Sequence, residues 1–354
     1  DDTRQWGPPY IGVEISYYLC ANRNKKSIIL NLKSEGAKRV LLDLVRRGDI
    51  LVENFRVGTM QKMGLDYQRL RQVNPRLIYS AISGYGQTGP YSNRAGYDFI
   101  AQAEGGLMSI TGETDGQPMK VGVAIVDITA GLFAATAILA ALHEREKSGE
   151  GQYIDVALLD SQVAWLANVA SNYLISGQRP KRYGNAHANI VPYETFKTQD
   201  GYIAIGVGND RQWQRFCEVL GKSEWAVDAR FITNSKRVEN RTTLISMIRA
   251  VTLTQDRAEW CRLLQAAGVP CGPINSIDQV FSDAQVLHRE MKVEIPHPTA
   301  GKVKLVGFPY KLSRTPATIT RHPPLLGEHT ETVLRDLLGY SAAEIAGLHA
   351  ERAI

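Results

Sequence analysis

The fold is decided by a stretch in which three β-rich runs, KSIILNL (26–32), DILVENF (49–55) and LIYSAI (77–82), alternate with helical patterns. The expected helices start at Ser34 and cover 58–63, 67–73 and about 160–176, and a fourth strand is expected at 153–158. Strands that alternate with helices in this way are typical of a parallel sheet covered by helices. We therefore predict an α/β fold class.

The pattern changes after residues 178–189, which are polar, basic and rich in turn residues. Beyond them we expect strands at 193–196 and 202–206, amphipathic helices to about 265, loops and short strands at 270–274 and 297–306, and a final helix at 330–338. We predict a large domain over 1–190, a smaller α+β domain over 191–296 and a C-terminal segment over 297–354.

The composition is that of an ordinary folded chain of 354 residues, 44% of them hydrophobic. Such a length can bury a core in two domains without support from disulfides or metals. The formal net charge of +5 favours acidic small ligands at least as much as nucleic acid, and we expect no nucleic-acid partner. The cysteines, Cys20, Cys217, Cys261 and Cys271, form no CxxC pair, so we expect reduced, mostly buried thiols in an intracellular compartment and no metal site.

One apolar stretch, 121–142, resembles a membrane span. It contains Asp127, and the charge-free part that follows, 128–142, has 15 residues, whereas a bilayer requires about 20. Its alanine and glycine content favours a helix buried between other elements, and we expect no membrane association. A lone carboxylate in an apolar helix needs hydrogen-bond donors, so Asp127 suits a structural and a catalytic role equally well.

Asp160 is the carboxylate with the strongest functional signal. It follows an expected strand and lies at the start of an expected helix, where open α/β folds bind their ligands. The partial positive charge of a helix N-terminus would keep the carboxylate ionised and nucleophilic. A plain helix N-cap is the alternative, because Asp is common at that position.

Basic residues gather around the first two strand–helix units, where they could bind phosphates or simply form a solvated face. They are Arg23, Lys25, Lys26, Lys33, Arg56 and Lys62. His187, in a loop, could act as a general base or face solvent. The chain has no GxGxxG after its first strand, no GxxxxGK[ST] and no GxSxG, so neither a standard dinucleotide fingerprint, nor a P-loop, nor a nucleophile elbow is indicated.

Short motifs along the whole chain resemble the class III CoA-transferases, a family that includes formyl-CoA transferase and the carnitine CoA-transferases. The motifs are NRNKKS (22–27), VENF (52–55), MGL (63–65), SGYG (83–86) with GP (89–90), GYD (96–98), GEGQ (149–152) with Asp155 and Asp160, GP (272–273) and PLLGEH (324–329). GYGQTGP, RAGYD, NYLISG, VPYETFKT and GVPCGPIN are most similar to the succinyl-CoA-dependent dicarboxylate branch, the succinate–hydroxymethylglutarate type.

This resemblance implies a Rossmann-like large domain that the C-terminal segment rejoins, a small inserted α+β domain, and a homodimer of interlocked ring-shaped subunits. It implies that Asp160 is the nucleophile and that Tyr85 lines the acyl pocket. The loop that covers the reaction centre in the family corresponds to 184–189, with Gly184 as its one glycine and His187 within it. The implied contacts to CoA are Leu30, Lys33, Asn54, Phe55 and Lys62, the last of which is often Arg in the family.

The implied reaction moves CoA from an acyl-CoA, succinyl-CoA in this branch, to a free acid such as glutarate or hydroxymethylglutarate. Asp160 attacks the thioester to form a mixed anhydride, and the CoA thiolate then forms an enzyme-bound thioester. The CoA thioester is thus a substrate, and no permanently bound cofactor is expected. Arg94 and Arg182 are candidates for holding the distal carboxylate of the acid. The resemblance implies a cytoplasmic protein in a bacterium and a mitochondrial one in a eukaryote.

Two alternatives stay open. The α-methylacyl-CoA racemases share the family's fold and abstract a proton with a His and an Asp. Asp127 matches that aspartate, but Tyr97 stands where their Gly-His-Asp triplet has histidine. The second alternative is a truncated, non-catalytic CoA-binding protein, because the family's first strand, with a CoA-contacting Arg and an active-site Gln, would precede Asp1.

Overall fold

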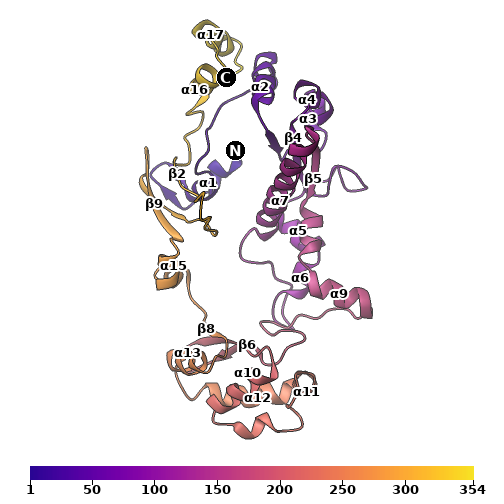
Figure 1. Ribbon diagram of the computed structural model, residues 1–354, viewed down its shortest axis with the longest axis vertical. Helices are drawn as coiled ribbons and strands as arrows, with labels where there is room; N and C mark the ends of the chain where they lie inside the picture. The colour runs from indigo at the N-terminus through magenta and orange to yellow at the C-terminus, as the bar shows by residue number, and fades with distance from the viewer. The chain divides into compact units, whose positions relative to one another are not determined.

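The computed structural model describes all residues, 1–354. The chain folds into two compact units, each assembled from separate stretches of sequence, and Figure 1 labels their elements. Unit 1 comprises 1–83, 134–156 and 276–354, and unit 2 comprises 84–133 and 157–275.

Parallel strands in unit 1 confirm the predicted α/β class. The sheet has the order β3 (Ile50–Glu53), β4 (Ile78–Ser83), β5 (Tyr153–Ala157), and β3 pairs with β4 in parallel. Helix α2 (Glu35–Arg47) precedes β3 in sequence, and α3 (Thr59–Lys62) and α4 (Tyr67–Val73) lie between β3 and β4. Their apolar side chains meet the sheet in one buried cluster that includes Leu70, Leu77 and Tyr79.

The GEGQ turn before β5 packs tightly against the segment that enters β4. The Gly151 N–H donates to the Pro75 carbonyl at 2.8 Å. A Cβ at Gly151 would lie 2.0 Å from the Leu77 carbonyl oxygen, which no side chain could tolerate. Close approach of the two backbones therefore explains this glycine.

The strand expected at 26–32 is wrong: this segment is extended but joins no sheet. Its backbone groups pair instead with the C-terminal part of the chain. The Asn31 N–H donates to the Ala353 carbonyl at 2.8 Å, and the Ile29 N–H donates to the Thr330 hydroxyl at 3.0 Å. The N–H groups of this segment thus donate to the Thr330 hydroxyl and the Ala353 carbonyl instead of to a neighbouring strand.

The C-terminal segment has one helix more than expected. The predicted helix at 330–338 is present as α16 (Thr330–Thr332) and a π-helical turn, η3 (Val333–Leu337), and α17 (Ala342–Ala350) follows. Ser341 begins α17 in a capping box with Glu344. The S-x-x-E spacing was visible in the sequence and could have predicted this helix.

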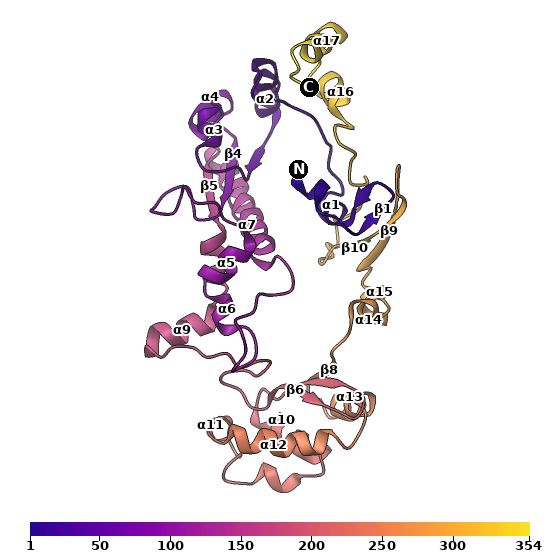
Figure 2. The same cartoon turned by 180° about the vertical axis from the view of Figure 1, so that it is seen from behind.

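An antiparallel hairpin and the N-terminal elements complete unit 1. Figure 2 shows the hairpin beside α1, against which its apolar face packs. The elements are η1 (Asp2–Gln5), β1 (Tyr10–Ile11), β2 (Glu14–Ile15), α1 (Ser16–Ala21), α14 (Ile277–Val280), α15 (Ala284–His288), β9 (Lys292–His297) and β10 (Gly301–Val306).

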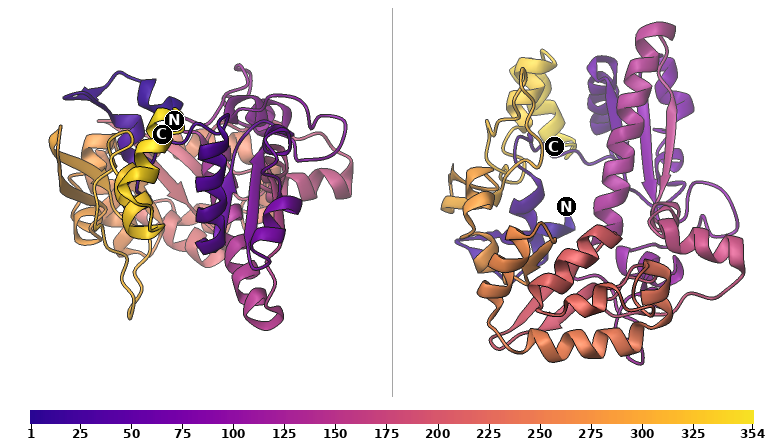
Figure 3. Two further views of the ribbon diagram at one scale, coloured as in Figure 1. Left: turned by 90° about the horizontal axis from the view of Figure 1, so that it is seen from above. Right: turned by 60° about the horizontal axis from the view of Figure 1, so that its bottom comes forward.

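Unit 2 contains a small antiparallel sheet with helices packed around it (Figure 3). Its strands are β6 (Tyr193–Lys197), β7 (Tyr202–Gly206) and β8 (Cys271–Pro273), and its helices are α5 (Asp98–Glu104), α6 (Leu107–Ile110), α8 (Leu158–Ala164), α9 (Ala167–Ser176), α10 (Asp210–Val219), η2 (Ser223–Ala226), α11 (Asn234–Glu239), α12 (Arg241–Thr252) and α13 (Arg257–Ala266). The pair β6–β7 matches the predicted strand pair. The boundaries of the predicted 191–296 domain stay a prediction.

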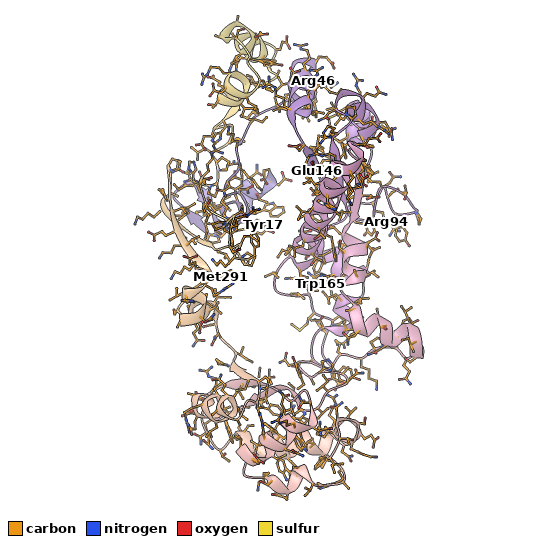
Figure 4. All side chains as sticks on the ribbon, in the orientation of Figure 1. Tyr17, Arg46, Arg94, Glu146, Trp165 and Met291 are labelled. Atoms are coloured by element: carbon orange, nitrogen blue, oxygen red, sulfur yellow. The ribbon has the colours of Figure 1, made fainter.

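The single helix expected over 160–176 is two helices. α8 ends at Ala164, and Ala167, the first residue of α9, has a φ of 42°. That backbone conformation is rare for a residue with a side chain, and it interrupts the helix. Trp165, labelled in Figure 4, lies in the connection and is 45% exposed.

The apolar stretch forms α7 (Ile125–Ser148), the one helix that is long and apolar enough to cross a membrane by length and composition, a test that core helices of soluble proteins also pass. Only 28% of its most apolar window is buried within the chain, which differs from the expected helix buried between other elements. The exposed side carries large residues such as Ile128 and Leu139. At its charged end, the buried Arg145 donates to the Asp49 carboxylate at 2.9 Å.

Candidate functional site

Asp160 lies in the first turn of α8, three residues after β5 ends, and its side chain is exposed. The N-cap of α8 is Ala157, and no side chain caps this helix by a hydrogen bond. The plain N-cap alternative for Asp160 is therefore wrong. Its carboxylate is accessible to a ligand.

Two glycine-containing motifs meet beside Asp160. The Leu159 N–H donates to the Gly84 carbonyl at 3.0 Å, which ties α8 to the SGYG turn. A Cβ at Gly84 would lie 2.6 Å from the Gly96 Cα, so the backbones of SGYG and RAGYD are in direct contact. Both glycines permit an approach that any side chain would block. Motifs far from Asp160 in sequence thus converge on it within unit 2.

Tyr85 is held by an aromatic neighbour in its own loop and by an acidic one at the end of α5. Its hydroxyl is hydrogen-bonded to the Glu104 carboxylate, and its ring meets that of Tyr91 edge to face at 5.8 Å. Burial, together with the bond to Glu104, raises the pKa of Tyr85, so the phenol stays neutral and remains a donor. The Arg94 guanidinium lies 3.7 Å from the centre of the Tyr91 ring.

A hydrogen-bond bridge that sequence reasoning missed joins α5 to the start of α7. The Asp98 carboxylate accepts from the Val126 N–H and from the Gln102 amide, both at 2.7 Å. The Gln102 amide oxygen accepts from the Val121 N–H at 2.9 Å, and the Gln102 side chain is fully buried. Asp98 belongs to the quoted GYD motif, whereas nothing in the local sequence marked Gln102.

Asp127 lies in the first turn of α7, one residue beyond this bridge. Although Asp127 is exposed on the surface of the chain, partial desolvation by the surrounding protein, followed by the charge of Asp98, raises the pKa of its carboxyl above its usual range. The bridge occupies the nearby Val126 N–H, so that donor is not available to Asp127. Its structural and catalytic roles both stay open.

Gln162 is a second residue that the sequence did not single out. Its side chain is 1% exposed and packs on Gly105, where a Cβ would come 2.3 Å from the Gln162 Cγ. Its amide nitrogen has no hydrogen-bond partner in the chain. Buried donors are normally hydrogen-bonded, so we expect this N–H to donate to a group that is not part of the chain, such as a water molecule.

The predicted CoA contacts lie in unit 1, where three of them surround the end of β3. The Asn54 amide donates to the Ile82 carbonyl at 2.8 Å, Phe55 is 47% exposed, and Lys62 is exposed at the end of α3. Lys33 is exposed just before α2, while Leu30 packs partly against a cluster formed by α2 and the C-terminal helices. Their contacts with CoA stay a prediction.

Arg182 and Gly184 are pinned to the turn at 112–116. Arg182 donates from Nε to the Glu113 carbonyl at 3.1 Å and from Nη2 to the Gly116 carbonyl at 2.6 Å. The Gly184 N–H donates to the Gly112 carbonyl at 3.1 Å. The first residue of the predicted covering loop, Gly184, and Arg182 just before that loop are therefore both anchored to this turn.

His187 is engaged by its own loop. Its Nδ1 accepts from the Asn189 N–H at 3.0 Å, and its ring contacts Tyr193 edge to face at 5.4 Å. The His187 carbonyl accepts from Arg241 at 2.7 Å. The sequence also allowed His187 to face solvent. In the structure one of its ring nitrogens, Nδ1, already has a hydrogen-bond partner within the chain.

A cavity of about 900 Å³ in unit 2 lies between α9, the 178–189 loop and α11. Its lining is mixed: aliphatic side chains such as Ile175 and Val238 stand beside amides of Asn168, Asn172 and Asn234 and the cations Arg179 and Lys181. No group of three or more His, Cys, Asp and Glu side chains could hold a metal ion.

The four cysteines are free thiols. Cys217 is buried, Cys261 and Cys271 are half-buried, and Cys20 is exposed, so three of the four fit the expected burial. Burial raises the pKa of Cys217 to about 12, which leaves it an inert apolar side chain.

Comparison with known proteins gives a consistent result. Residues 1–330 match the family model described as CoA-transferase family III. The succinyl-CoA:glutarate CoA-transferase of Mus musculus is 46% identical over 348 residues, 98% of this chain and 80% of that protein. The succinate–glutarate CoA-transferase of Agrobacterium fabrum is 46% identical over 343 residues, 95% of this chain and 86% of that protein. A crystal structure of a CaiB/BaiF family protein from Brucella suis superposes with a TM-score of 0.83 at 43% identity, covering 96% of this chain and 89% of that one.

Proposed function

Because the chain belongs to CoA-transferase family III, we propose that it moves CoA from succinyl-CoA to a dicarboxylic acid such as glutarate. The names of its relatives from mouse and Agrobacterium support this choice of donor and acceptor. The structural observation that carries the proposal is the exposed Asp160, with Gly84 and Gly96 packed together beside it.

In the proposed mechanism Asp160 is the nucleophile. Its carboxylate oxygen attacks the thioester carbonyl, the C–S bond breaks, and CoA leaves as a thiolate. The thiolate then attacks the aspartyl carbonyl of the mixed anhydride and releases the donor acid. The acceptor acid then reverses these two steps: its carboxylate attacks the enzyme-bound thioester and releases the thiolate, which attacks the new anhydride and frees Asp160. No bond is oxidised or reduced in this sequence, and no metal is required.

The surrounding groups would assist by position and polarity. Backbone N–H groups of the glycine turns could donate to the oxyanion that each attack creates, and glycines let the backbone come close enough to do so. Tyr85 would line the acyl pocket with its hydroxyl oriented by Glu104. In unit 1, Lys33 and Lys62 would bind the CoA phosphates, with Leu30, Asn54 and Phe55 at the adenine.

We also propose that the chain works as a homodimer, interlocked as in its family. The exposed apolar side chains of α7 and α9 support a second copy as the occupant of these faces. They include Ile128, Leu139, Leu174 and Ile175, the last two being 79% and 85% exposed. Surfaces of this kind are typical of interfaces rather than of faces in contact with water.

The decisive experiment combines Asp160→Asn with chemical trapping. Glutaryl-CoA formed from succinyl-CoA and glutarate is measured by mass spectrometry, and we expect Asp160→Asn to reduce it to background. The matched control, Asp336→Asn, removes an exposed carboxylate paired with its neighbour Arg335 and should retain activity. With hydroxylamine and succinyl-CoA, the modified residue should be Asp160.

Two outcomes would contradict this assignment. One is normal CoA transfer by the folded Asp160→Asn variant. The other is a hydroxamate on Asp127 or Asp155 in place of Asp160. Deuterium exchange at the α-carbon of a 2-methylacyl-CoA, with no CoA transfer, would instead favour the racemase alternative.

A further inference from the structure

We propose that Arg94 binds the distal carboxylate of the dicarboxylic acid and so makes the site prefer dicarboxylates to monocarboxylates. This inference rests on the proposed function. While one carboxylate of the acid reacts at Asp160, the other must either stay in water or meet a cation. A cation close to the reacting end would distinguish glutarate from a monocarboxylic acid of the same length, because it attracts the second carboxylate.

The Arg94 side chain is presented in a form suited to this task. Its guanidinium carbon lies 3.7 Å from the centre of the Tyr91 ring, and the Arg94 N–H donates to the Tyr91 carbonyl at 2.9 Å. Contact with the ring occupies one face of the planar group and leaves its N–H edge free. No carboxylate of the chain forms an ion pair with Arg94, although other surface arginines such as Arg230 have such partners.

The loop that carries Arg94 is linked by backbone contacts to the start of α8, where Asp160 lies. Gly96, two residues after Arg94, is in backbone contact with Gly84, whose carbonyl accepts from Leu159, the residue before Asp160. Figure 4 places Arg94 on the loop between β4 and α5 that contains both glycines. All of these contacts lie within unit 2.

The aromatic residues of the loop connect Arg94 with the proposed acyl pocket. Tyr91 lies between Arg94 and Tyr85, contacting the first by its face and the second at 5.8 Å. Arg94 and Tyr85 therefore contact the same tyrosine ring. No ion pair joins Glu104 to Arg94, so the guanidinium is not paired with this nearby carboxylate.

Arg182, the other arginine suggested by the sequence, is a weaker candidate. Two of its nitrogen atoms already donate to the Glu113 and Gly116 carbonyls. Binding a carboxylate in bidentate fashion would break these bonds and release the 182–184 segment from its anchor. The geometry assigns Arg182 to holding the loop and leaves Arg94 for the substrate.

The test is an internal competition between two acids of equal chain length. Wild-type protein and the variants receive limiting succinyl-CoA with equal concentrations of glutarate and valerate, and the ratio of glutaryl-CoA to valeryl-CoA is measured by mass spectrometry. Both acids compete for the same enzyme-bound CoA, so the ratio is independent of the donor step. A lost charge-assisted pair predicts that Arg94→Gln lowers the ratio roughly ten- to hundred-fold.

Two variants serve as controls. Arg94→Lys keeps the charge but loses the planar fork, so its ratio should lie between those of wild type and Arg94→Gln, and it provides a test if Arg94→Gln does not fold. Arg182→Gln should leave the ratio unchanged even if it lowers the thermal midpoint.

The inference is overturned if the ratio for Arg94→Gln falls by less than tenfold, or if Arg182→Gln lowers it equally. Should Arg94→Gln fail to fold, an unchanged ratio for Arg94→Lys overturns it. If wild-type protein transfers CoA to neither acid, the proposed function fails first, and this inference fails with it. Transfer by wild type with unaltered selectivity in the variants refutes only the role of Arg94.

Discussion

Replacement of Arg237 by methionine should destabilise the core of unit 2 by about 2–5 kcal/mol. The guanidinium is fully buried and donates to the Val191 carbonyl at 2.8 Å, the Phe231 carbonyl at 2.9 Å and the Asp210 carboxylate at 2.9 Å. Methionine would retain the apolar contact with the Trp213 ring but no donor. Two buried carbonyls left unpaired cost about 1–2 kcal/mol each, and the half-exposed Asp210 adds less than about 1 kcal/mol because water can replace its partner.

Tryptophan fluorescence during urea unfolding gives a direct measurement of this loss. Three of the five tryptophans, Trp213, Trp225 and Trp260, lie in the core cluster of unit 2, so the signal follows that core. With an m-value of about 2 kcal/mol/M, the midpoint of the unit 2 transition should fall by about 1–2.5 M urea.

The matched control is Arg262→Met. Arg262 also pairs with a carboxylate of unit 2, that of Glu259 at 2.6 Å, but both side chains are exposed, by 65% and 38%. Exposed pairs contribute less than about 1 kcal/mol, so this midpoint should fall by no more than about 0.5 M. An equally small shift for Arg237→Met would refute the reasoning from burial.

Two further predictions concern α7. Partial desolvation raises the pKa of Asp127, so the folded state binds its proton more tightly than the unfolded chain, and the free energy of unfolding falls as pH rises from 3.8 through the raised pKa. Asp127→Asn should therefore have a higher thermal midpoint than wild type at pH 7 and an equal one at pH 3, and a difference independent of pH would contradict this. Light scattering should give wild type twice the mass of a single chain, and Leu139→Asp, a change on the exposed apolar face of α7, should shift it toward the monomer. A monomeric wild type would contradict the proposed homodimer.

Local signals were sufficient for much of the fold. The Ser34 hydroxyl caps α2 by accepting from the Ala37 N–H, as residue type and position predicted. The alternation of apolar runs with helical patterns predicted a parallel sheet, and β3 and β4 do pair in parallel. The same reasoning located Asp160 at a strand–helix junction, because chain order alone decides which residue follows β5.

Other features depended on partners far away in sequence. Residues 26–32 have the composition of a strand, yet they join no sheet because Thr330 and Ala353 take their backbone groups. A break at Ala167 divides the expected helix after Asp160, although no local breaker residue marks the position. Local propensity cannot report which distant atoms will satisfy a backbone N–H.

The sequence by itself determined the fold class, the family and the residues that could be functional. Only the tertiary structure decided how those residues are used. It brought Gly84, Gly96 and Leu159 into contact beside Asp160, and it separated two arginines that looked equivalent. Arg182 is engaged by backbone carbonyls, while Arg94 faces outward from a tyrosine ring without an ion-pair partner. The physical reason is that a side chain's chemistry follows from its type, whereas its availability depends on every group the fold places within hydrogen-bond distance.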